Sequence, residues 1–143
     1  HRGQIVIHKT LKEDVIHLFR FMRNQRFPIE SAIPIRFDKP NDGTSMDTLN
    51  NSYSFHYRRI STSGNGSRSV HSYGMAIDIN PYNNPAVLAN GKVIPQGGTY
   101  DRDIPGTLAD TSPVVKEFIR LGWTWGGNWT SLKDYMHFEK KLP

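Results

Sequence analysis

The chain has 143 residues, 36% of them hydrophobic, and carries a net charge of +5 with a pI near 9.6. This length fits one domain over residues 1–143, and no apolar run approaches the roughly eighteen residues of a membrane span. No cysteine occurs, which excludes disulfides and leaves only nitrogen and oxygen atoms as metal ligands. The positive charge favours anionic partners or reflects a solubilising surface. Because the basic residues are scattered and no nucleic-acid motif accompanies them, nucleic acid is not an expected partner.

The N-terminal part of the chain predicts one strand and one helix. The strand runs from Ile5 to His8. A capping box of Thr10 and Glu13 then precedes apolar residues at helical spacing, which predicts a helix over about Leu11 to Asn24 with one apolar stripe. The polar segment from Asp38 to Asn51 is expected to lie across the mouth of the site.

Two further strands are predicted in the middle of the chain. One runs from Ser54 to Ile60 and is followed by a turn at Gly64 to Gly66. The other runs from Met75 to Asn80, and its alternation places Asp78 on the face opposite Ile77. Asp78 is therefore expected to be fixed on a rigid strand.

The residues around this last strand include metal-binding types. His71 precedes Asp78 by an odd number of residues, so on an unbroken strand the two would point to opposite faces; Gly74 marks the bend that lets them converge. A second group, Asp134 to His137, follows near the C-terminus. Two histidines and an aspartate are a set that zinc takes with one position open for water, and Asp134 is then free to act as a base. The pattern indicates a metallohydrolase.

The segment between Pro81 and Thr111 is rich in Asn, Gly and Pro, and at about thirty residues it is long for a passive connection. It either walls the substrate cleft or forms an ordered surface excursion. The first interpretation is favoured because the segment leaves the strand that carries Asp78.

The C-terminal part predicts a second helix and a last strand. Ser112 as cap, Pro113 at the first helical position and Gly122 past the end delimit the helix. The strand, Tyr135 to Lys140, places His137 on the same face as Glu139. Glu139 is expected to orient a ligand or balance a charge, not to bind metal itself.

The segment Ser69 to Asp78 resembles the Ser-x-His-x-x-Gly-x-Ala-x-Asp signature of the zinc D,D-carboxypeptidase and L-alanyl-D-glutamate endopeptidase family, peptidase family M15, which shares its fold with the hedgehog signalling domain. The resemblance runs nearly end to end. Its other blocks are Arg26 to Ile29, Phe55 to Arg58, Gly122 to Trp129 and Asp134 to Phe138. It implies an α+β fold of the hedgehog/DD-peptidase type, a single domain in which a small antiparallel sheet carries the zinc site and helices pack on that sheet.

The resemblance also implies roles for individual residues. Asp134 would be the general base, with a helix or turn cap as the alternative. Arg58 would steady the oxyanion, although Arg59 beside it leaves the choice open by one residue. The implied zinc ligands are His71, Asp78 and His137. The expected substrate contacts are Ser69, Tyr73 and Trp125.

Other histidines and tryptophans carry a structural interpretation. The histidines expected to be surface or hydrogen-bonded residues are His1, His8, His17 and His56. Among these, His56 is the least secure because it lies two residues before Arg58. For Trp123, Trp125 and Trp129 as a group, core packing is favoured over a platform for substrate.

The implied activity is zinc-dependent hydrolysis of peptide bonds in the stem peptides of bacterial peptidoglycan. Both L-Ala-D-Glu endopeptidase and D-Ala-D-Ala carboxypeptidase types remain open, and an aspartate as the base resembles the endopeptidase branch. A zinc-containing module that binds cell-wall peptide without cutting it is the alternative, and a phage lysin would share the chemistry. The chain starts at His1 without an initiating methionine or signal sequence, which predicts a processed or truncated form. A monomer exported to the periplasm, cell wall or medium is expected.

Overall fold

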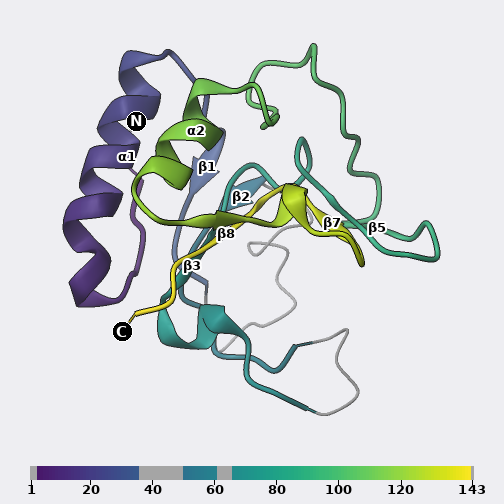
Figure 1. The fold of residues 1–143 in the computed structure, drawn as a ribbon, viewed down its shortest axis with the longest axis horizontal. Coiled ribbons are helices and arrows are strands. Elements are labelled where there is room, and N and C mark those ends of the chain that lie inside the picture. Colours follow the sequence, from purple (N-terminus) through teal and green to yellow (C-terminus); the bar gives the residue numbers. More distant parts are fainter. Residues whose placement is uncertain (1–2, 36–49, 61–65, 143) are drawn as a thin grey trace.

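The computed structural model describes residues 3–35, 50–60 and 66–142, in which two α-helices lie side by side against small β-sheets (Figure 1). The helices are η1 (Lys9–Leu11), α1 (Lys12–Asn24), η2 (Val70–Tyr73), α2 (Pro113–Arg120) and η3 (Gly126–Asn128). The strands are β1 (Ser31–Ala32), β2 (Asn51–Ser52), β3 (Ala76–Asp78), β4 (Ala86–Val87), β5 (Val93–Ile94), β6 (Thr124–Trp125), β7 (Lys133–Asp134) and β8 (His137–Glu139). The expected α+β class is therefore confirmed. Within the described ranges, none of the helices combines the length and the apolar character that crossing a bilayer requires.

The β-structure consists of two three-stranded antiparallel sheets and one parallel pair. The first has the order β3-β8-β6 and the second the order β5-β4-β7, while β1 and β2 form a short parallel pair. In the first sheet Asp78 of β3 is the register partner of His137 of β8. The short β7 and β8 are close in the chain but belong to different sheets.

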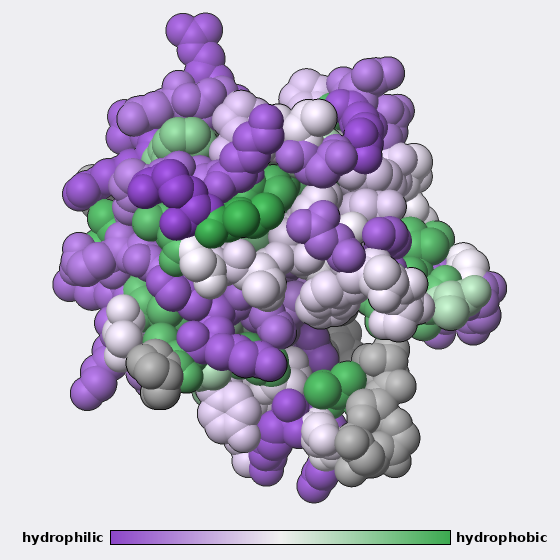
Figure 2. Space-filling model, in the orientation of Figure 1, coloured by the Kyte–Doolittle hydropathy of each residue, from purple (hydrophilic) through white to green (hydrophobic). Residues whose placement is uncertain are grey.

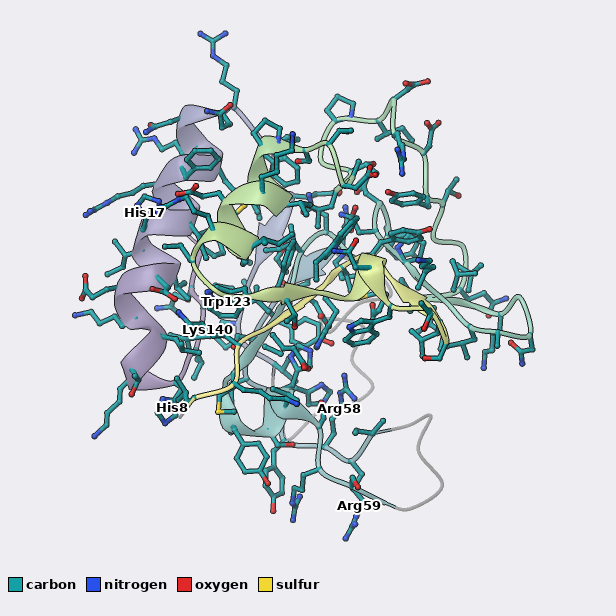
Figure 3. All side chains as sticks on the ribbon, viewed as in Figure 1. His8, His17, Arg58, Arg59, Trp123 and Lys140 are labelled. Carbon is teal, nitrogen blue, oxygen red and sulfur yellow. The ribbon has the colours of Figure 1, made fainter. Side chains whose placement is uncertain are left out.

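The hydrophobic core lies between the helices and the first sheet. The apolar stripe predicted for the first helix is confirmed, because Val15, Leu18 and Met22 are buried. Lys140 Nζ and Trp123 Nε1 both donate to Asp14 Oδ2 of α1, at 2.7 and 3.1 Å, and tie the helix to the C-terminal chain (Figure 3). On the outside, the face in Figure 2 is mostly hydrophilic, with separated hydrophobic areas.

Both α-helices form where the sequence predicts them, but the start of α1 differs from the prediction. The prediction of a capping box formed by Thr10 and Glu13 is wrong. The short 3-10 helix η1 precedes α1, and Nδ1 of His8 accepts the Thr10 N–H at 3.3 Å. The N-cap of α1 makes no side-chain hydrogen bond. For α2, Pro113 at the first position and Gly122 past the end, with φ +83°, are confirmed.

Two of the four predicted strands do not form. Residues 5–8 are joined to their neighbours by single backbone bonds, such as His8 N–H to Gly74 O at 2.9 Å. Residues 54–60 contain one isolated bridge, Arg59 to Arg68, and the strand before them, β2, ends at Ser52. Most of the segment Asp38 to Asn51, and Gly64 and Asn65 of the predicted turn, lie outside the described residues.

Candidate metal site and cavity

Three side chains of metal-binding types meet where β3 and β8 pair. Oδ1 of Asp78 lies 3.2 Å from Nε2 of His71 and 3.1 Å from Nδ1 of His137, and these two ring nitrogens are 3.2 Å apart. All three residues are buried, with exposed fractions of 3%, 1% and 7%. One ligand atom from each fits within 4.8 Å of the others. The structure thus brings together the three residues that the sequence singled out.

His71 reaches Asp78 because the chain bends at Gly74. The short helix η2 carries His71, and Ser69 caps it by accepting the His71 N–H at 3.3 Å. Gly74 ends this helix in the left-handed region, with φ +62°. A Cβ at Gly74 would lie 2.8 Å from the backbone nitrogen of His8. The predicted bend is therefore confirmed, and the close packing of the N-terminal segment adds a second reason for glycine.

We expect Gly74→Ala to destabilise the fold by about 1–2 kcal/mol or more and to weaken metal binding, because the bend that positions His71 cannot keep its geometry. Thermal unfolding and metal titration measure the two effects. Gly91→Ala is the matched control, since Gly91 has φ +80° but no described residue lies within 4 Å of its Cβ position. That control should show only the backbone cost. Unchanged metal affinity in Gly74→Ala would mean that the bend does not position His71.

Hydrogen bonds outside the cluster fix which ring nitrogens face Asp78. Nδ1 of His71 donates to the carbonyl oxygen of Ser54 at 2.7 Å, because a carbonyl can only accept. Nε2 of His137 donates to Oε2 of Glu139 at 3.2 Å. Nε2 of His71 and Nδ1 of His137 therefore remain for a metal ion, and the hydrogen bond of Glu139 to His137 is compatible with both roles expected of it, orienting a ligand and balancing a charge.

The charges in the cluster favour a cation at its centre. Burial alone would raise the pKa of Asp78, but His71 and His137 hold it well below its usual range. Burial alone would lower the pKa of His137, but its hydrogen bonds to Asp78 and Glu139 raise that pKa to about 10. A buried carboxylate between two imidazoles suits either a proton or a divalent metal ion.

The cluster forms part of the wall of a cavity of about 440 Å³. The segment between Pro81 and Thr111 contributes Ala86, Leu88 and Ile94, which lie in and next to the β4–β5 hairpin, while its residues 95–111 do not line the cavity. The other polar lining residues are His56, Arg58, Ser69, Asp134 and Glu139. The apolar lining residues are Ile60, Val70, Ala86, Leu88, Ile94, Trp129, Leu132 and Met136. The lining of the cavity is thus partly polar and charged and partly apolar.

Asp134 enters this cavity from the second sheet. It lies on β7 opposite Ala86 of β4, and its backbone passes so close to Gly126 that a Cβ there would lie 2.5 Å from the Asp134 oxygen. Its Oδ1 is covered, and no described residue hydrogen-bonds it, so the carboxyl group does not act as a cap through this atom. Burial and the charge of Asp78 raise the pKa of Asp134 to about 7. A carboxyl group in this state is suited to exchange a proton near neutral pH.

Of the two adjacent arginines, Arg58 is the one that lines the cavity. Its backbone N–H donates to Oγ of Ser72 at 2.9 Å, next to the residue that carries the metal-binding ring. The exposed Arg59 donates instead to the carbonyl oxygen of Gly66, and in Figure 3 it lies toward the edge of the molecule while Arg58 lies further in. The sequence left open which of the two arginines lies at the site, and the structure places Arg58 there.

The expected substrate contacts are placed unequally. Ser69 lines the cavity, whereas Tyr73 is 55% exposed and does not line it. Trp125 is 3% exposed, belongs to the hydrophobic core and donates its Nε1 hydrogen to the backbone carbonyl oxygen of Tyr135 at 2.8 Å. This agrees with the core packing favoured for the three tryptophans and differs from the expected substrate contact of Trp125. Trp129 does line the cavity, with its ring 5.2 Å from that of His137. It is therefore the tryptophan that meets the site.

His56 also lines the cavity, which differs from the surface or hydrogen-bonded role expected of it. Its Nδ1 is covered and has no hydrogen-bond partner among the described residues. Burial, together with the charges of Arg58 and His71, lowers the pKa of His56 to about 4, so the ring is neutral at neutral pH. The signal in the sequence was its i, i+2 relation to Arg58.

Comparisons with known proteins agree with this geometry. A family model of peptidase family M15, described as D-alanyl-D-alanine carboxypeptidase, matches residues 62–140. The chain is also 36% identical over 80 residues to the peptidoglycan L-alanyl-D-glutamate endopeptidase CwlK of Bacillus subtilis (strain 168), covering 56% of this chain and 44% of that protein. No solved structure matches the chain. Because the family model matches more than half of its residues, the chain belongs to the M15 peptidase family described as D-alanyl-D-alanine carboxypeptidase.

Proposed function

We propose that this chain is the catalytic domain of a zinc-dependent peptidase that hydrolyses peptide bonds in the stem peptides of bacterial peptidoglycan. The observation that carries the proposal is the buried group of His71, Asp78 and His137 on the wall of a cavity that also holds Asp134 and Arg58. Two imidazoles and one carboxylate are a ligand set of catalytic zinc sites, which keep a further position open. We also propose that residues 1–143 form one domain with a fold of the hedgehog/DD-peptidase type.

The residues of the cavity can divide the reaction between them. Zinc, when bound by the three ligands, supplies a Lewis acid that polarises the peptide carbonyl and lowers the pKa of water. Asp134 accepts a proton from the attacking water as its oxygen bonds to the carbonyl carbon. Arg58 donates hydrogen bonds to the carbonyl oxygen as that atom becomes negative. The C–N bond then breaks, and Asp134 returns the proton to the leaving amine.

Within this activity, we propose an endopeptidase, the type that the name of the matched Bacillus subtilis protein gives. A carboxypeptidase must also bind the free terminal carboxylate of its substrate, which calls for a second cationic group. Among the described residues that line the cavity, Arg58 is the one lysine or arginine, and it is assigned to the reacting carbonyl. The matched Bacillus subtilis protein is named an endopeptidase, whereas the description of the family model names a carboxypeptidase.

The deciding experiment is mass spectrometry of purified stem peptides after incubation with the protein, with and without a chelator. Chelator-sensitive cleavage at the L-Ala-D-Glu bond is expected. Release of terminal D-alanine would instead assign the carboxypeptidase type. Binding of stem peptide without any cleavage would contradict the proposal and indicate a non-catalytic zinc-containing module.

The proposed substrate indicates where the protein acts, and the proposed site residues indicate its oligomeric state. Peptidoglycan lies outside the cytoplasmic membrane, so we propose that the protein acts in the periplasm, in the cell wall or outside the cell. We further propose that it acts as a monomer, because the residues assigned to the reaction all come from one chain. Sedimentation analysis of the active protein tests this second proposal.

The role of Arg58 gives a kinetic prediction. Arg58→Ala should lower kcat by about 10²–10³-fold with little change in KM, because the negative charge that it meets develops only in the transition state. Steady-state kinetics on a soluble stem peptide measure the split. Arg58→Lys should recover part of the loss, since a planar guanidinium positions two donors and an ammonium does not.

Arg59→Ala is the matched control for this prediction and should have near wild-type kinetics, because Arg59 is exposed and bonded to Gly66. Equal losses in the two alanine variants would mean that the arginines act through general attraction of an anionic substrate. A salt titration of kcat/KM would show that alternative directly.

A further inference from the structure

The backbone of His56 is held by the same short helix that carries the metal-binding ring of His71. The His56 N–H donates to the carbonyl oxygen of His71 at 3.1 Å, and the His56 carbonyl oxygen lies 3.4 Å from Oγ of Ser72. Ser72 also bonds the backbone of Arg58 in both directions, at 2.7 and 2.9 Å. Hydrogen bonds from the backbone of His71 and the side chain of Ser72 therefore hold the backbone of His56 and Arg58 next to the candidate metal site.

The His56 side chain is partly buried, and it belongs to the lining of the cavity that holds the metal-binding cluster and Asp134. Its Nδ1 is covered and unpartnered among the described residues. A covered ring nitrogen without a partner is unfavourable to the fold, so hydrogen bonding within the described residues does not explain why a histidine stands at this position. A neutral imidazole offers one donor and one acceptor, which is what a peptide group requires of its partner.

Packing alone gives His56 a simpler role, which has to be separated from binding. Its ring lies edge-on to Tyr53, with the ring centres 6.0 Å apart and the planes at 75°. Tyr53 in turn lies 5.2 Å from the ring of His71. A phenylalanine at position 56 would keep this edge-on contact and lose both ring nitrogens. The packing role and the hydrogen-bonding role therefore predict different results for His56→Phe.

We propose that His56 is a further substrate-binding residue of this cavity, whose ring hydrogen-bonds a peptide group of the bound stem peptide beside the group that Arg58 contacts. This inference rests on the proposed peptidase function. It assigns His56 to holding the substrate in both the ground state and the transition state. The effect of removing it should therefore fall on KM, in contrast to the kcat effect expected for Arg58.

The test compares His56→Phe and His56→Gln with the wild type on one soluble stem peptide that contains the L-Ala-D-Glu bond. His56→Phe should raise KM about tenfold with a small change in kcat, and His56→Gln should recover part of that loss. Calorimetric binding of the same peptide in an Asp134→Asn background, where turnover is slow, should weaken by the same factor. Zinc content and melting temperature should stay at wild-type values. His17→Phe, which alters an exposed histidine of α1, is the control.

Each other outcome decides against the inference. Wild-type KM and binding in His56→Phe would show that the ring serves packing only. Loss of zinc or of folding in both His56→Phe and His56→Gln would assign the residue to the structure of the metal site. If the wild-type protein neither binds nor cleaves the peptide, the proposed function itself fails, and this inference fails with it. That result differs from cleavage by the wild type with no effect of the His56 variants.

Discussion

His71→Ala or His137→Ala is expected to remove both the bound metal and the peptidase activity. Each substitution leaves one imidazole and one carboxylate, which is too few protein ligands for a catalytic zinc site. Zinc should stabilise the wild type against unfolding by about 2.7 kcal/mol when free zinc is a hundred times its dissociation constant, and it should not stabilise either variant. Elemental analysis, thermal unfolding with and without zinc, and peptide cleavage measure the three effects.

A matched histidine variant separates this effect from the loss of any imidazole. His17 lies on α1 and is paired with Glu117 of α2 at 2.5 Å, outside the cavity. His17→Ala should therefore retain zinc, the zinc-dependent stabilisation and activity. Stoichiometric zinc in either His71→Ala or His137→Ala would refute the ligand assignment.

The convergence of the metal-binding residues could be predicted from the sequence because regular alternation determines which face a side chain occupies. Asp78 and His137 both lie on strands, and pairing β3 with β8 makes them register partners. His71 has the wrong parity for an unbroken strand, so a bend had to precede Asp78, and Gly74 was the residue that permits one. Here local rules and the tertiary structure agree.

The failures occur where the backbone is extended but not part of a ladder. Residues 54–60 alternate like a strand, yet the structure gives them one isolated bridge, so alternation does not determine the direction of His56. The tryptophans show a related limit. Trp125 is the register partner of the buried Phe138 and points inward, while Trp129 follows η3 and turns toward His137. Strand register and the path of a short helix are tertiary facts that residue spacing does not encode.

The division of the site between two sheets makes binding and catalysis separable. The proposed metal ligands Asp78 and His137 lie on the first sheet, whereas Asp134 lies on the second, opposite Ala86. No described hydrogen bond joins the Asp134 side chain to the cluster; Asp78 and His137 act on its pKa through their charges. Asp134, the proposed base, can therefore be altered without removing a proposed ligand or a hydrogen-bond partner of one.

Asp134→Asn is accordingly expected to keep zinc and to lose turnover by about 10²–10⁴-fold, the usual range for a general base. Asparagine has nearly the same shape as aspartate and cannot accept the proton. Zinc titration, peptide binding and kcat measure the separation. Glu139→Gln gives the contrasting result: because Glu139 orients His137, its change should weaken zinc affinity about 10–100-fold and affect turnover mainly through metal loss.

The pH dependence supplies a second readout of the same residue. In the proposed reaction the ionised form of Asp134 is the base, so activity should fall as the pH drops below the pKa of this group, and Asp134→Asn should lack this limb. A bound cation lowers that pKa below the value of about 7 in the metal-free cavity.

The raised pKa of Asp134 also makes the stability of the metal-free protein depend on pH. The folded state holds the Asp134 proton more tightly than the unfolded state, so the free energy of unfolding falls as the pH rises from the pKa of Asp134 in the unfolded state to its pKa of about 7 in the folded state. Metal-free Asp134→Asn should therefore melt at a higher temperature than the wild type at neutral pH. If the variant cleaves at the wild-type rate with an unchanged pH profile, the base lies elsewhere, and Glu139 is the next carboxylate to test.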